Sequence, residues 1–138
     1  MARLTFSMAV SSYRFVVIES MKRQVDAYFE HAGEKYRVEC KGEDQSIKAE
    51  AIDKFFMSLD AAGISGLFVS MSGFDVSAET AARLHGKERP ILLMNGNETR
   101  AVMTLQVGFD DVIDQKRAYF DQRSDPYYRV AIPNAAVD

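Results

Sequence analysis

The hydrophobic pattern of this chain changes its period partway along, and this change limits the folds that the chain can adopt. Residues 24–30 and 35–41 alternate between apolar and polar side chains, as strands with one buried face do. Residues 46–62 then repeat apolar side chains every three or four positions, which predicts an amphipathic helix. Two short apolar runs, 64–71 and 90–94, are typical of strands that are covered on both faces.

Further segments complete this order of elements. An apolar, β-branched run that starts at residue 14 predicts a first strand. Residues 77–85, with Ser77 as the cap, and residues 109–123 predict two more helices, and Asn95-Gly96 predicts a turn that stops the strand before it. Strands followed by alternating helices and strands predict an α/β protein with a mixed central sheet flanked by helices.

The chain is expected to form a single domain over residues 1–138. Its length is about that of one domain, and no linker rich in Pro, Gly or Ser divides it. We place the core at about residues 14–123. This boundary leaves a shortened N-terminus and a C-terminal tail, 124–138, that is expected to run along the surface.

Composition and charge narrow the possible partners. The 17 basic and 20 acidic residues give a formal net charge of −3, which provides no overall attraction to nucleic acid or anionic lipid. The longest apolar runs are far shorter than the roughly 20 residues that span a bilayer, so no membrane partner is expected. The single cysteine, Cys40, cannot form an internal disulfide, which fits a reducing compartment. We therefore expect a cytoplasmic protein.

The two alternating segments predict a hairpin that brings two carboxylates together. If a two-residue turn at Ala32-Gly33 closes the hairpin, the numbers of paired residues sum to 65, and Asp26 lies opposite Glu39. Both residues then belong to the polar face of the hairpin. Like charges in directly opposed positions are destabilising, by about 0.2–1 kcal/mol. The pair therefore needs a shared proton, neighbouring Lys or Arg residues, or a divalent cation.

A divalent cation bound by the two carboxylates would give the hairpin a chemical function. Mg²⁺ prefers oxygen ligands and binds through one or two carboxylates together with substrate phosphate. Lys41 lies two residues after Glu39, hence on the same strand face, where its ammonium group could position water or stabilise charge on a phosphate. These groups suffice for metal-assisted hydrolysis of a phosphodiester. From spacing alone, a solvated hairpin face remains the commoner explanation.

A longer pattern resembles the PD-(D/E)xK nuclease superfamily and, within it, the Mrr-like restriction endonuclease catalytic domains. The resemblance covers about residues 14–105. It is carried by the order and spacing of four features, namely Asp26 on the hairpin, the string Glu39-Cys40-Lys41, the apolar strand that leads to Ser72-Gly73-Phe74, and the strand that ends at Asn95-Gly96.

The resemblance implies a restriction-endonuclease-like fold and a Mg²⁺-dependent DNA endonuclease, with Mn²⁺ as a substitute. It assigns metal binding to Asp26 and Glu39, and catalysis to these two residues with Lys41. DNA is then the expected partner, together with a second copy of the chain or a separate DNA-reading domain or subunit. The alternative is a catalytically inactive domain of the same fold that acts as a nucleic-acid-binding or protein-interaction module.

Several other polar residues are expected to support this site. Gln24 pairs with Lys41 in the assumed register, and Glu19 on the first strand could supply a third acid. The candidate phosphate or DNA contacts are Lys22, Arg23, Arg37, Lys48, Ser70 and Ser72.

Overall fold

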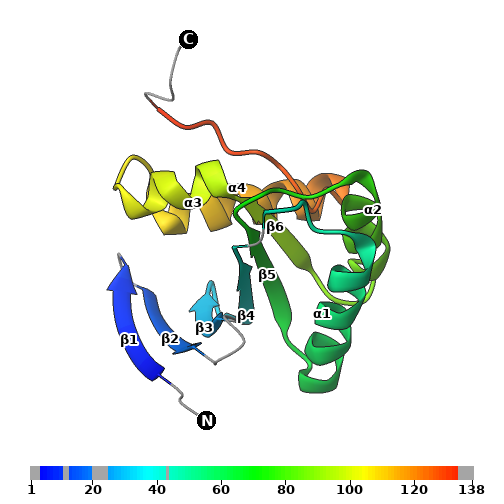
Figure 1. Cartoon of the computed structure of the whole chain (residues 1–138), viewed down its shortest axis with the longest axis horizontal. Coiled ribbons are helices and arrows are strands. Elements are labelled where there is room, and N and C mark those ends of the chain that lie inside the picture. Colours follow the sequence, from blue (N-terminus) through cyan, green and yellow to red (C-terminus); the bar gives the residue numbers. More distant parts are fainter. Residues whose placement is uncertain (1–3, 11–12, 20–24, 43, 134–138) are drawn as a thin grey trace.

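The computed structural model describes the backbone of residues 4–10, 13–19, 25–42 and 44–133, and the side chains of this part from residue 27 onward. The elements follow one another as β1 (Leu4–Val10), β2 (Tyr13–Glu19), β3 (Val25–His31), β4 (Glu34–Lys41), α1 (Ala49–Ala62), β5 (Ser65–Ser70), α2 (Val76–His85), β6 (Ile91–Asn95), α3 (Gly96–Met103) and α4 (Phe109–Arg123) (Figure 1). Within these described ranges, no helix has the length and apolar character needed to cross a bilayer.

The strands form one mixed sheet in the order β1-β2-β3-β4-β5-β6. The first four strands pair antiparallel with their neighbours, whereas β4, β5 and β6 run parallel. The direction changes after β4 because the chain reaches β5 through α1 rather than through a tight turn, and parallel neighbours require such a crossover. The predicted mixed sheet flanked by helices is thereby confirmed.

A hydrophobic core lies on each face of the sheet. One core joins Val38, Leu67 and Leu92 to Ile113 of α4. The other joins strand residues such as Phe68 to α1 and α2, which lie together on one side of β5 and β6 (Figure 1). All six residues of β5 are buried, as expected for a strand covered on both faces.

The hairpin of β3 and β4 has the predicted register. Asp26 is the partner of Glu39, and Tyr28 is the partner of Arg37. Ala32 and Gly33 form the connection, with φ values of 52° and 79°. Two consecutive positive φ values are typical of a type I′ turn, whose twist matches that of the strands it joins. The apolar face is buried as predicted, at Ala27, Phe29, Tyr36 and Val38.

The structure differs from the prediction at both ends of the chain. Residues 4–10 form β1, an edge strand paired with β2, rather than the predicted short tail. After α4, the chain lies partly in the interior rather than on the surface, because Tyr127 and Val130 are only 6% and 5% exposed. The amide of Leu93 donates to the carbonyl of Pro126 at 2.9 Å, so this segment also covers the edge of β6.

Three helix starts also differ from the sequence prediction. The helix expected from residue 46 begins at Ala49. Asp75, not Ser77, caps α2, because its carboxylate accepts from the Ala78 amide at 2.9 Å. Asn95-Gly96 does not end in a turn but starts α3, where Asn95 and Glu98 form a reciprocal capping box.

A buried ion pair ties α3, α4 and the C-terminal segment together. Lys116 Nζ lies 2.9 Å from Glu98 Oε2, with the two side chains 0% and 1% exposed. Glu98 also accepts from the Val130 amide at 2.8 Å, and Lys116 donates to the Tyr128 carbonyl at 2.7 Å. Burial lowers the pKa of Lys116, although the charge of Glu98 acts against this shift. The ion pair and the two hydrogen bonds to the backbone together compensate for removing both charges from water.

The helix α1 packs closely on β5 because Gly66 has no side chain. A Cβ atom at this position would lie 2.5 Å from Cδ1 of Leu59 and 2.6 Å from Cε2 of Phe55. Both neighbours are fully buried in the core beneath α1, so neither can move away freely. Gly66 therefore determines how near the helix approaches the sheet.

Replacing Gly66 with Ala is expected to lower the free energy of unfolding by roughly 1–3 kcal/mol, because the added methyl group overpacks the core. Urea denaturation followed by circular dichroism measures the change. The matched control is Gly42→Ala, since a Cβ at Gly42 meets nothing within 4 Å. Equal stability of the two variants would contradict the close approach of α1.

Replacing Ala32 with Asn is expected to stabilise the protein by roughly 0.5–1 kcal/mol, because Asn tolerates the left-handed conformation better than Ala does. The same denaturation experiment tests this expectation. Ala32→Val serves as the opposite control and is expected to destabilise the protein, since a β-branched residue is strained at positive φ. Equal free energies of unfolding for the Ala32→Val and Ala32→Asn variants would contradict the hairpin geometry.

Candidate active site

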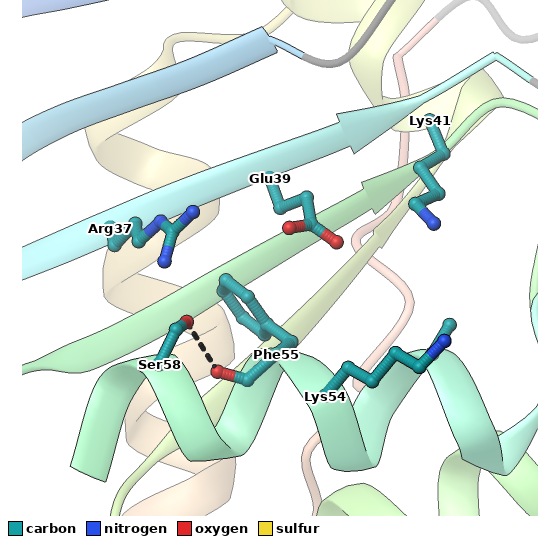
Figure 2. A pocket seen from close by; sticks show the side chains of 7 residues that line it. Arg37, Glu39, Lys41, Lys54, Phe55 and Ser58 are labelled. Atoms are coloured by element: carbon teal, nitrogen blue, oxygen red, sulfur yellow. Dashed lines mark hydrogen bonds between the residues drawn. The ribbon is translucent and has the colours of Figure 1, made fainter. Parts of the chain in front are cut away.

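Polar side chains on one face of β4 line a cavity beneath α1. Strand alternation places them opposite the face that carries Tyr36 and Val38, which are buried in the other core. The cavity has a volume of about 260 Å³. Figure 2 shows the side chains of β4 extending toward the helix. The lining consists of Arg37, Glu39 and Lys41 from β4 and Ala51, Lys54, Phe55 and Ser58 from α1.

Glu39 occupies the middle of the β4 wall. It lies between Arg37 and Lys41 along the strand (Figure 2), and its partner on β5 is Phe68, which is fully buried. Glu39 itself is only 8% exposed. A carboxylate that is withdrawn from water requires nearby compensating charge. Three basic side chains, Arg37, Lys41 and Lys54, line the same cavity as Glu39.

The backbone brings Asp26 to the position predicted for it. Asp26 is the Cα partner of Glu39, and alternation along β3 places it on the face opposite Ala27, which is buried. Directly opposed residues on antiparallel strands have Cβ atoms about 4.5–5.5 Å apart. The register therefore makes Asp26 and Glu39 a candidate pair of metal ligands. The side chain of Asp26 itself lies outside the described part of the chain.

The turn that follows β5 lies beside Lys41. Ser70 is the partner of Lys41, and its buried hydroxyl donates to the carbonyl of Gly73 at 2.8 Å. The Ser72 carbonyl accepts from the Ser46 hydroxyl at 3.2 Å. Ser70 thus closes the turn, and Ser72 is the more accessible of the two predicted phosphate contacts.

The register of β2 and β3 places Glu19 on the wrong face for the predicted third acid. Glu19 is the partner of Val25, whereas Ile18 is the partner of Asp26. Paired residues share a sheet face, so Glu19 belongs to the face opposite Asp26 and Glu39. A shift of one residue in register would have reversed this result.

The remaining predicted DNA or phosphate contacts are not found at the cavity in the part of the chain that the structure describes. Lys48 is exposed immediately before α1 and does not line the cavity. Residues 20–24, which include Lys22, Arg23 and Gln24, lie outside the part that the structure describes. Their assigned roles stay predictions.

Lys54 is a cavity residue that the sequence pattern does not identify. It extends from α1, beside the apolar stripe that includes Ile52 and Phe55. The helical period indicates which face of α1 is buried. It does not indicate that the polar residues beside this face lie over β4. Only the packing of the helix on the sheet therefore identifies Lys54.

Cys40 lies on the face of β4 that is turned away from the cavity. It packs against the core on the face opposite Glu39 and Lys41. Burial raises the pKa of its thiol, which disfavours the thiolate form needed for a nucleophile.

The paired carboxylates suit a hard divalent cation. Mg²⁺ needs only one or two carboxylates and keeps several waters, and the cavity beside Glu39 has room for them. Among the side chains that the structure describes, no group of three or more His, Cys, Asp or Glu lies close enough to hold a metal ion. Asp26, whose side chain is not among these, and Glu39 are the candidate ligands.

A comparison with protein families relates this geometry to a known group. The family model Mrr_cat, described as a restriction endonuclease, matches residues 9–103, which include β2, the hairpin, the cavity and α3. Comparisons with curated proteins and with solved structures found no match.

Proposed function

The chain belongs to the Mrr_cat family of restriction endonucleases, and on this premise we propose that it hydrolyses DNA phosphodiesters with Asp26, Glu39 and Lys41 as its catalytic residues. The observation that carries the proposal is the register of the hairpin. It pairs Asp26 with Glu39, while Lys41 lies on the same face of β4 and lines the same cavity. Mg²⁺, with Mn²⁺ as a substitute, is the proposed cofactor.

In this mechanism, Asp26 and Glu39 would hold the divalent cation on the polar face of the hairpin. When bound, the cation supplies Lewis acidity toward a phosphate oxygen and a water molecule. Lys41 positions the attacking water, or donates to a phosphate oxygen and stabilises the negative charge that develops on the phosphate. Two aromatic rings near Glu39, those of Phe55 and Phe68, are buried and form an apolar part of its surroundings, where electrostatic interactions are stronger than in bulk water.

Asp26→Asn, Glu39→Gln and Lys41→Ala are each expected to reduce DNA cleavage by at least about 100-fold, because each removes a group that acts in the transition state. Nicking of supercoiled plasmid in Mg²⁺ or Mn²⁺ measures the rate.

The matched controls for these variants lie on the same hairpin. Glu30→Gln on β3 and Lys35→Ala on β4 change exposed residues of the same charge. Both controls are expected to cleave at the wild-type rate. Site variants that are folded, as judged by circular dichroism, and still cleave like the wild type would remove the proposed catalytic assignment.

Calorimetric titration with Mg²⁺ and Mn²⁺ is expected to show saturable binding to the wild type that is lost in Asp26→Asn. Ca²⁺ provides a comparison ion, and the titration is repeated with DNA present because phosphate can supply the remaining ligands.

Absence of metal binding under both conditions would favour the alternative function, a catalytically inactive module that binds nucleic acid or protein. In that case Asp26→Asn is expected to be as stable as the wild type or more stable, since it relieves a repulsion between carboxylates. A second copy of the chain, or a separate DNA-reading domain or subunit, remains part of the proposal for the active form.

A further inference from the structure

Cationic side chains face the cavity from both of its walls. Arg37 and Lys41 extend from β4, and Lys54 extends from α1. Figure 2 shows the amino groups of Lys41 and Lys54 at the same end of the cavity, one on each wall. An anion entering at this end would therefore meet positive charge from two opposite directions.

Lys54 is only weakly held in its present position. Its partner is Glu50, one helical turn earlier, with Nζ and Oε1 separated by 3.6 Å. The two side chains are 79% and 83% exposed, and exposed pairs of this kind contribute little because water screens them. The long side chain of Lys54 can thus turn toward a ligand at the loss of only this exposed pair with Glu50.

The charge of the cavity is opposite in sign to that of the whole chain. Its described lining holds three cationic side chains and one carboxylate, a formal surplus of three minus one, or two positive charges. Counting Asp26 on the adjacent strand still leaves one positive charge. The chain as a whole carries −3. A concave site of one sign with low-dielectric walls concentrates ions of the opposite sign.

From these observations we propose that Lys54 and Lys41 clamp one phosphate group between α1 and β4, and that this clamp binds phosphate without any metal ion. The phosphate is that of the substrate strand, an identification that rests on the proposed nuclease function. The clamp itself depends only on the two lysines and on the packing of α1 over β4. Lys54 is accordingly a substrate-binding residue supplied by the helix rather than by the hairpin.

Binding of inorganic phosphate to metal-free protein tests the clamp. ³¹P nuclear magnetic resonance in the presence of EDTA is expected to show saturable binding to the wild type. Lys54→Ala and Lys41→Ala are each expected to weaken this binding by about tenfold, because each removes a charge-assisted contact. Lys54→Arg is expected to retain it.

Two control variants separate the clamp from general effects. Glu50→Ala removes the helical partner of Lys54, and Lys87→Ala removes an exposed lysine that does not line the cavity. Both are expected to bind phosphate like the wild type. A wild-type protein that binds no phosphate, or a Lys54→Ala variant that binds it equally well, would overturn the clamp.

Cleavage kinetics distinguish failure of the clamp from failure of the nuclease function. In an active enzyme, Lys54→Ala is expected to raise KM for DNA about tenfold with little change in kcat, and to reduce the salt dependence of binding by about one charge. Unchanged KM and salt dependence in an active enzyme contradict the clamp and leave the nuclease function intact. Phosphate binding that depends on Lys54 in a protein that cleaves no DNA supports the clamp and contradicts the nuclease function.

Discussion

The close seating of α1 on β5 is the constraint on which the rest of the structure depends. It is possible because Gly66 leaves room for Leu59 and Phe55 of the helix. Gly66 is also the β5 partner of Arg37, so this close packing lies beside the Arg37 end of the cavity. From there the helix extends over Glu39 and presents Lys54 opposite Lys41 (Figure 2). A helix held further from the sheet would leave the polar face of β4 open to water, and Glu39 would lose its buried surroundings.

Much of the fold could be predicted because two patterns have strict geometry. The period of two and the two-residue turn are enough to pair Asp26 with Glu39 from residue spacing alone. The position of Glu19 could not be predicted, because the β2–β3 register depends on a connection that the pattern does not constrain. Asn95 is typical of a turn because a glycine follows it. The glutamate three residues later is the stronger signal, and it marks a helix start.

The candidate site could be predicted only where it lies on one hairpin. Glu39 and Lys41 are neighbours in sequence and therefore neighbours in space. Lys54 lies in the same cavity because of tertiary packing, which no local spacing in the sequence indicates.

The net charge of the chain is also a poor guide to the charge of the site. A net charge of −3 argues against an attraction to DNA, yet the cavity lining holds more cationic than anionic side chains. The sum over a chain says little about the field inside one cavity.

The ion pair of Glu98 and Lys116 restricts how this sequence can diverge. Both charges are withdrawn from water, and both also hold the backbone of the segment after α4. Loss of either partner alone would strand the other charge in the interior, whereas replacing both by apolar residues of similar volume can be tolerated. A single substitution at either position is therefore expected to destabilise the protein. The two residues are expected to be inherited together, so covariation between them in related chains would report the docking of the C-terminal segment.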